Sequence, residues 1–315
     1  MDHCVFIHTN HRQYVGALVS QYSMRRNSRH ADRFEVRIIH HKDHVFFRRH
    51  EGQEYLRDGI KWTWLNEDLQ SFTPLRFMPP ELMGYRGRAV VVDPDVFAVA
   101  DVWELLSRDM GGKAILCRMH GGVKRTVRGG YASSVMLLDC AKLMHWKIEE
   151  QFDELFALKR DYRTWIGLEY EDPATIGALE PEWNDFDRLT ERTKMIHNTR
   201  RKTQPWKSGL PVDFRPVEHF PLFPPFGWLM TARRKLFGDY AFLGSYNRHP
   251  DGNQEALFFG LLRECVEKGI VSEDLLREEM RRNHVRHDAF EVMVRAPAVD
   301  DLLAGLTTAR RRAAA

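Results

Sequence analysis

Short apolar stretches and helical patterns alternate along the first two-thirds of the chain. Strands are predicted where apolar residues run together or alternate with polar ones, at residues 4–8, 34–40, 60–65, 89–92, 113–118 and 132–139. Helices are predicted after Thr9 or Asn10, either of which can cap the first one, within the proline-rich stretch 72–85, and at 102–109. This alternation is typical of an α/β fold, in which helices flank a parallel or mixed sheet.

The pattern changes beyond about residue 185. The chain is then irregular and rich in Pro, Trp and Arg, and it becomes helical from about residue 226 to 290. The last stretch, TTARRRAAA (307–315), is predicted to be frayed or disordered, as chain ends often are. We therefore expect an α/β part over residues 1–210 and a helical part over residues 211–315.

The composition is that of a soluble globular protein. Of the 315 residues, 43% are hydrophobic and 29% are charged, and no run approaches the roughly 18 apolar residues that a membrane span needs. The first residues lack the basic start and long apolar core of a signal peptide. The cysteines are widely separated in apolar surroundings, which predicts buried free thiols and a cytoplasmic protein. They are Cys4, Cys117, Cys140 and Cys265.

Basic residues cluster locally although the net charge is only +3. The clusters at 25–33 and 200–202 could bind nucleic acid, bind a phosphorylated small molecule, or form a solvated surface. They are scattered and no helix-turn-helix or RNA-binding signature accompanies them, so we expect no nucleic-acid partner. The 15 histidines include no H-x-x-x-H pair with a nearby acid, which argues against that kind of zinc enzyme.

The stretch VVVDPDVF (90–97) joins an apolar strand to two carboxylates. Pro94 has no N–H for a sheet ladder, so the strand should end there, with Asp93 at its carboxyl end. Ligands bind at that end of strands in open α/β sheets. Asp93 and Asp95 could together hold a hard divalent cation that also binds phosphate oxygens. The alternative is that Asp93 caps the following turn and Asp95 is solvated.

A wider stretch around these aspartates resembles a known enzyme family. The similarity covers RGRAVVVDPDVFAVADVWELL (86–106), which looks like the D-x-D segment of family-eight glycosyltransferases, the glycogenin and lipopolysaccharide galactosyltransferase group. In that family a buried strand ends in D-x-D, and an aspartate, here Asp101, precedes a short helix. The resemblance implies a GT-A fold, with a Rossmann-like sheet that binds a nucleotide-diphosphate sugar.

Two further stretches carry the resemblance, which extends over roughly residues 3–210. The first strand and helix, VFIHTNHRQYVGALVSQYS (5–23), match the unit that cradles uridine in the family. The match implies nucleotide contacts at Thr9, Asn10 and Tyr14. KMIHNTRRKTQPW (194–206) resembles the family's I-H-x-x-G-x-x-K-P-W, whose histidine completes the metal site and corresponds to His197 here. A buried core histidine is the alternative for this position.

The same comparison implies roles for three further residues. Arg76 lies 17 residues before Asp93, about where the family places a basic residue on the nucleotide. A surface arginine is the alternative for that position. The family's donor-sugar motif N-x-G corresponds here to Ala132-Ser133-Ser134, which places Ser133 and Ser134 near the donor sugar without the asparagine amide.

The chain departs from the family pattern at three more points. The glycine after the metal histidine is absent, and Gln204 replaces the lysine before P-W. Either Lys202 or Lys207 could then supply the cation for the diphosphate. The family's D-Q pair has no counterpart in RTWIGLEYED (163–172), so no catalytic residue is assigned. The polar stretch 246–257 could line an acceptor site or could simply cap a helix.

These features together predict a metal-dependent glycosyltransferase of the hexosyltransferase type. Its donor would be a nucleotide-diphosphate sugar, a UDP-sugar by the resemblance, bound with nucleotide contacts at Asp93 as well. The cation would be Mn²⁺, or alternatively Mg²⁺, on Asp93, Asp95 and His197. The resemblance implies retention of configuration, with residues 1–210 catalytic and 211–315 on the acceptor side. The acceptor, carbohydrate, lipid or protein, and the oligomeric state stay open.

Two other functions compete with this prediction. A sugar nucleotidyltransferase or pyrophosphorylase would need a glycine-rich basic loop after the first strand, which TNHRQYVGA (9–17) does not supply. A degenerate glycosyltransferase kept as a binding or scaffolding module is favoured by the missing D-Q pair and the altered N-x-G. The set of Asp93, Asp95 and His197 argues against it.

Overall fold

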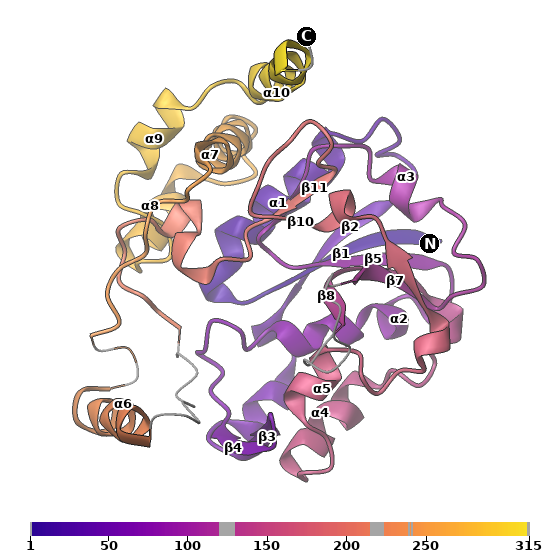
Figure 1. Cartoon of the computed structure of the whole chain (residues 1–315), viewed down its shortest axis with the longest axis vertical. Helices are drawn as coiled ribbons and strands as arrows, with labels where there is room; N and C mark the ends of the chain where they lie inside the picture. Colours follow the sequence, from indigo (N-terminus) through magenta and orange to yellow (C-terminus); the bar gives the residue numbers. More distant parts are fainter. Residues whose placement is uncertain (1, 120–129, 215–223, 239, 241, 314–315) are drawn as a thin grey trace.

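The structure is a computed structural model that describes residues 2–119, 130–214, 224–238, 240 and 242–313 (Figure 1). Its centre is a mixed six-stranded sheet in the order β2-β1-β5-β8-β7-β9. The strands β1, β2 and β5 are parallel, β8 runs antiparallel to both of its neighbours, and β9 is parallel to β7. The bounds are β1 His3–Thr9, β2 Glu35–His40, β5 Arg88–Val92, β7 Ile115–Met119, β8 Tyr131–Asp139 and β9 Ile176–Leu179.

Helices cover both faces of this sheet because its inner strands are apolar on both sides. On β1, Cys4 and Phe6 face one hydrophobic core, while Val5 and Ile7 face the other. The first core includes residues of α4 and α5, and the second includes residues of α1 and α3. The bounds are α1 Tyr14–Arg26, α2 Pro79–Leu82, α3 Trp103–Leu106, α4 Ile148–Phe156 and α5 Tyr162–Ile166. The predicted α/β class is confirmed.

Two smaller sheets complete the α/β part. The hairpin of β3 (Glu54–Arg57) and β4 (Ile60–Thr63) contains the strand expected at 60–65, apart from the main sheet. A three-stranded sheet in the order β10-β11-β6 brings together Asp185–Phe186, Met195–His197 and Val96–Ala98. This second sheet matters for the site, because it places residue 197 beside the chain that follows Asp95.

The C-terminal part is helical, as expected. Helix α7 packs against α1, and a shared hydrophobic cluster contains Val19 of α1 and Phe258 of α7. The prediction of a frayed or disordered tail is wrong for residues 307–313, because α10 continues to Ala313. Alanine and arginine, which make up most of that stretch, are strong helix formers. The bounds are α6 Pro224–Phe237, α7 Gly252–Glu267, α8 Glu273–Arg281, α9 Ala289–Arg295 and α10 Val299–Ala313.

Two further expectations can be compared with the fold. All four cysteines are buried and free, as predicted, and burial raises the pKa of Cys4, Cys117, Cys140 and Cys265 to about 12. Among the helices that the structure describes, none is both long and apolar enough to cross a membrane. The division of the chain near residue 210 stays a prediction.

Candidate metal and nucleotide-sugar site

The two aspartates lie on the turn that follows the central strand β5. The strand ends at Val92, before Pro94, as the missing proline N–H predicts. The Asp93 N–H still donates to the Ser134 carbonyl at 3.0 Å, and the chain then enters β6 at Val96. The turn therefore delivers both carboxylates to the carboxyl end of a buried parallel strand, where ligands bind in such sheets.

Asp93 is held by two cationic or polar neighbours. The Nε and Nη2 atoms of Arg76 donate to Asp93 Oδ1 at 2.9 and 2.7 Å, and Nη2 also contacts Oδ2. His8 Nε2 lies 2.9 Å from the same Oδ1. Burial alone would raise the pKa of Asp93, but the charge of Arg76 and the contact with His8 outweigh it and lower that pKa. Asp93 is therefore ionised in this structure.

His8 completes this arrangement from the neighbouring strand. Ile7 pairs with Val92 in the parallel register of β1 and β5, so His8, still within β1, lies beside Asp93, the first residue after β5. His8 is fully buried, and burial lowers its pKa although Asp93 acts in the opposite direction. A neutral imidazole that donates from Nε2 to Asp93 fits both observations.

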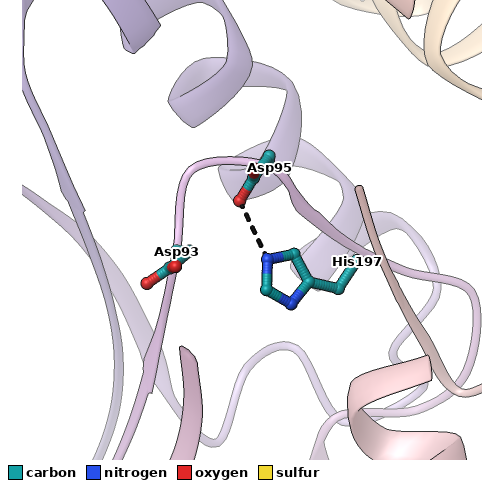
Figure 2. Close-up of side chains that lie close together, drawn as sticks. All are labelled: Asp93, Asp95 and His197. Atoms are coloured by element: carbon teal, nitrogen blue, oxygen red, sulfur yellow. Dashed lines mark ion pairs between the residues drawn. The ribbon is translucent and has the colours of Figure 1, made fainter. Parts of the chain in front are cut away.

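Asp95 lies opposite His197 (Figure 2). His197 Nε2 is 3.3 Å from Asp95 Oδ1, and Gln204 Nε2 donates to Asp95 Oδ2 at 3.1 Å. The other imidazole nitrogen, Nδ1, lies 2.9 Å from the amide oxygen of Asn184. An amide oxygen only accepts hydrogen bonds, so Nδ1 carries a proton and Nε2 faces the carboxylates.

The electrostatics of His197 follow from this geometry. The side chain is buried, which by itself would lower its pKa, but the charge of Asp95 and the hydrogen bond to it raise that pKa overall. Backbone contacts also join the two residues: His197 pairs with Val96 across β11 and β6, and the Asn198 N–H donates to the Asp95 carbonyl at 3.1 Å.

The three side chains fit a divalent cation. One ligand atom each from Asp93, Asp95 and His197 can be chosen so that all lie within 4.8 Å of one another. Ligands on opposite sides of an ion at about 2.0–2.3 Å are separated by roughly 4–4.6 Å, so small side-chain shifts would suffice. The Asn184 contact is of the kind that orients metal-ligating histidines. Asp93 Oδ2 has one neighbour, Arg76, and keeps lone-pair capacity for an ion.

Helix α1 packs against the turn that contains Asp93 and Asp95. A side-chain carbon added at Gly16 would lie 3.0 Å from the Pro94 carbonyl oxygen, so the helix backbone is packed closely against the turn. One helical turn further on, Ser20 Oγ donates to the Val96 carbonyl at 2.6 Å. Ser23 Oγ then accepts from the Ala98 N–H at 2.9 Å. The edge of β6 that does not pair with β11 is thus bonded to side chains of α1.

Asp93, Asp95 and His197 line a cleft of about 890 Å³. Other charged residues that line the cleft had no role in the sequence analysis, among them Arg163, Glu169 and Arg201. Arg163 is paired with Asp58, at 3.8 Å. The predicted site residues that lie on the cleft are Arg76, Asp93, Asp95, Ser133, Ser134 and His197.

Ser133 and Ser134 position other residues of the cleft. Ser133 Oγ accepts from Arg76 Nη1 at 2.8 Å and donates to the Ile166 carbonyl at 2.6 Å. Ser134 Oγ accepts from Asn184 Nδ2 at 3.0 Å. The stretch that replaces the family's donor-sugar motif therefore fixes the arginine that holds Asp93 and the asparagine that orients His197.

The residues expected around the nucleotide base are not all brought to the cleft. Thr9 and Asn10 are fully buried. The Asn10 side chain caps the turn before α1 through the Arg12 N–H and bonds Ser71 Oγ at 3.2 Å, so it fastens a loop rather than lining the cleft. Tyr14 lies in a separate groove beside His40 and α8. Nucleotide contacts of these residues stay predictions.

Neither predicted lysine lines the cleft. Lys202 is exposed and approaches the Leu243 carbonyl at 3.5 Å. Lys207 is fully buried and bonded to Asp213, whose other oxygen accepts from Tyr246. Burial lowers the pKa of Lys207, although the charge of Asp213 acts in the opposite direction. Arg201, one residue before Lys202, is the cation of this segment that lines the cleft.

Four residues of the site have no assigned role in the sequence analysis: His8, Asn184, Arg201 and Gln204. His8 could have been inferred from strand register, since it follows Ile7 on β1 as Asp93 follows Val92, the partner of Ile7 on β5. Gln204 was noted only as a missing lysine, yet its amide contacts Asp95. Asn184 has no local sequence signal, because its importance depends on meeting His197 from the short helical turn Pro181–Asn184.

No protein-family model and no curated protein sequence matches the chain. Solved structures do match it. The glycosyltransferase GlyE of Streptococcus pneumoniae TIGR4 has a TM-score of 0.46 and 12% identity, over 85% of this chain and 64% of GlyE. This chain therefore spans less than two-thirds of that protein. The galactosyltransferase LgtC, solved with donor and acceptor sugar analogs, has a TM-score of 0.45 and 11% identity, over 64% of this chain and 89% of LgtC.

A third match is mouse xyloside xylosyltransferase 1, with a TM-score of 0.42 and 14% identity, over 64% of this chain and 98% of that protein. All three are glycosyltransferases, the class of protein that the sequence resembles. The likenesses are distant, and neither a substrate nor a reaction follows from them.

Proposed function

We propose that this chain is a metal-dependent glycosyltransferase that uses a nucleotide-diphosphate sugar as donor. The observation that carries the proposal is the meeting of Asp93, Asp95 and His197 at the carboxyl end of the central strand, on a large cleft. Residues about 100 positions apart in the sequence supply two carboxylates and an oriented imidazole at one point. That donor set suits Mn²⁺ and related divalent ions.

The proposed reaction breaks the bond between the anomeric carbon and the diphosphate, which leaves negative charge on the diphosphate. A cation bound here would act as a Lewis acid toward that charge. Arg201 is proposed to bind the diphosphate in place of the expected lysines, because it lines the same cleft and keeps its charge at any physiological pH. Arg76 is proposed to hold Asp93 ionised and in place for donor binding.

The finer parts of the proposal come from the sequence resemblance. Uridine as the base, a hexose as the sugar and retention of configuration are carried by the similarity of residues 3–210 to family eight. Ser133 and Ser134 are proposed to lie near the donor sugar, because both line the cleft beside Asp93 and Asp95. Glu169 also lines the cleft, but no nucleophile or base is assigned to it.

A thermal-shift screen tests the proposal directly. The protein would be heated with UDP, GDP or ADP, each with and without Mn²⁺, since a ligand that binds only the folded state raises the melting temperature. We expect stabilisation by one diphosphate that requires the metal and is lost in Asp95→Asn. Asp101→Asn is the matched control, because Asp101 lies shortly after β6 on the same stretch of chain but is bonded to His30 and does not line the cleft. Stabilisation that survives in Asp95→Asn would contradict the proposed site.

The products separate the proposed enzyme from the two competing functions. A glycosyltransferase incubated with its donor releases a nucleoside diphosphate, by transfer or by slow hydrolysis. A nucleotidyltransferase instead forms pyrophosphate from a nucleoside triphosphate and a sugar phosphate. A scaffold would bind its partner equally well as wild type and as Asp95→Asn, with no turnover of either kind.

A further inference from the structure

The described chain on the two sides of α6, residues 209–212 and 244–246, is paired backbone to backbone at one place, the base of the α6 segment. There, the Gly209 N–H donates to the Tyr246 carbonyl at 2.9 Å and the Tyr246 N–H donates to the Leu210 carbonyl at 2.8 Å. The Val212 N–H donates to the Gly244 carbonyl at 3.0 Å. The base is therefore fixed to the body by paired backbone, next to the buried contact between Lys207 and Asp213.

Helix α6 exposes large apolar side chains. Trp228 is 79% exposed, Leu229 65% and Leu236 74%. Phe237 is 61% exposed and lies edge-to-face with Phe242, at 5.1 Å between ring centroids, and Phe242 is itself 78% exposed. Figure 1 shows α6 apart from α7–α10 and from the main sheet. Such a concentration of exposed apolar surface on one helix marks a contact surface.

The helical repeat gathers part of this surface into one face. At about 100° per residue, Trp228, Leu229 and Leu236 fall within an arc of about 100° that also contains Ala232. Lys235 lies just beyond one edge of that arc and Arg233 just beyond the other edge, at roughly 20° and 40°. The helix sequence PPFGWLMTARRKLF contains three basic residues and no acidic one.

We propose that α6 docks on the surface of a lipid bilayer that carries anionic headgroups. Helices that lie in the membrane interface combine large apolar residues such as Trp and Leu on one face with basic residues beside it, as α6 does. Lys235, at one edge of the face, can extend to a headgroup phosphate while the apolar side chains enter the acyl boundary. The helix sequence contains basic residues and no acidic one, which suits contact with an anionic surface.

The helix lies on such a surface rather than crossing it. Its 14 residues span about 21 Å, shorter than the roughly 30 Å hydrocarbon core of a bilayer. The contact is independent of the proposed transfer reaction, because metal and nucleotide would bind at the cleft and not on α6.

Co-sedimentation with vesicles tests the inference on the full chain. The vesicles would be equal parts phosphatidylglycerol and phosphatidylcholine, or phosphatidylcholine alone, at low and high salt. We expect binding to the anionic vesicles that weakens in high salt, since surface charge is screened. Trp228→Ser with Leu236→Ser should weaken binding at least tenfold, because each buried large apolar side chain contributes about that factor or more. Lys235→Glu should weaken it several-fold.

The matched control replaces two exposed apolar residues far from α6 in the sequence, Met144→Ser with Val294→Ser. These side chains are 64% and 80% exposed, so the control removes a comparable apolar area and should bind like wild type. Absence of wild-type binding to anionic vesicles, or an equal loss in the control, would overturn the inference. So would a dimer in light scattering that the Trp228/Leu236 variant dissociates, since α6 would then contact a second copy of the chain.

Discussion

Asn184 offers the sharpest test of how the proposed metal site is built. Its amide oxygen accepts from His197 Nδ1 at 2.9 Å and its amide nitrogen donates to Ser134 Oγ at 3.0 Å, in a fully buried position. Asn184→Leu keeps most of the side-chain volume but removes both hydrogen bonds. The imidazole would then be free to rotate, and its Nε2 would no longer be held toward Asp95. We expect weaker metal binding and a less stable fold.

The size of both effects follows from the contacts. Loss of the partner that orients a metal-ligating histidine typically lowers metal affinity about 10–100-fold, which corresponds to about 1.4–2.7 kcal/mol. The variant also leaves the N–H of His197 buried without an acceptor. That change should lower the free energy of unfolding by about 1–3 kcal/mol in the absence of metal. Asn184→Asp restores an acceptor and should recover most of the metal affinity.

Free Mn²⁺ measured by electron paramagnetic resonance during a titration would give the affinity, and urea unfolding would give the stability. The control is Asn27→Ala, which removes a partly buried asparagine hydrogen bond, from Asn27 Nδ2 to the Ala98 carbonyl at 2.7 Å, away from the cleft. It should lower stability with little change in Mn²⁺ affinity. Unchanged affinity in Asn184→Leu, or an equal loss in Asn27→Ala, would refute the orienting role.

Three further changes have defined outcomes. Arg76→Met removes the main partner of the buried Asp93 and should lower the free energy of unfolding in urea by about 3–5 kcal/mol. Adding Asp93→Asn to Arg76→Met should recover part of the lost unfolding free energy. A loss below about 1 kcal/mol in Arg76→Met alone would argue against the pairing of Arg76 with Asp93. Gln204→Leu should weaken Mn²⁺ binding several-fold in the same titration while Asp95 stays in place; tighter binding would contradict a supporting role. Burial raises the pKa of Glu264, but hydrogen bonds from Arg26 and Tyr22 lower it overall. The ionised Glu264 therefore stabilises the fold above the carboxyl's ordinary pKa of about 4.3, and this stabilisation should be lost as the pH falls further. The unfolding midpoint of Arg26→Met should accordingly vary less with pH between about 3 and 5, and an unchanged profile would show that the pair contributes nothing.

The sequence predicted the elements that burial determines. The valines of β5 could only lie in a sheet covered on both faces, and Pro94 had to end that strand, because it cannot donate to the ladder. The position of Asp93 and Asp95 at the strand end follows from these two facts. The residues that depend on distant contacts were harder to predict. Asn184 reaches His197 only because β10 and β11 pair, and nothing near residue 184 signals that pairing.

Local sequence patterns also did not determine the direction in which the side chains of a helix or turn point. Tyr14 was expected to contact the nucleotide, which stays a prediction; in the structure it lies on the side of α1 that packs toward the C-terminal helices. Arg201 and Lys202 are neighbours on a short helical turn after His197, so they point in different directions. Arg201 lines the cleft, whereas Lys202 is exposed elsewhere. The resemblance and the basic residues indicated that the segment after His197 lies near the site. Which of its basic side chains lines the cleft depends on the path of the backbone.

The close packing of α1 on the motif turn has a consequence for how the two parts of the chain can move. The carbonyl of Pro94 leaves little room for a side chain at Gly16, and Ser20 bonds the first residue of β6. Helix α7 packs on the same helix α1. Any shift of the C-terminal helices that displaced α1 would therefore also displace Asp95 relative to Asp93, which remains attached to the central sheet. The distance between the two carboxylates would then report on the position of the C-terminal part.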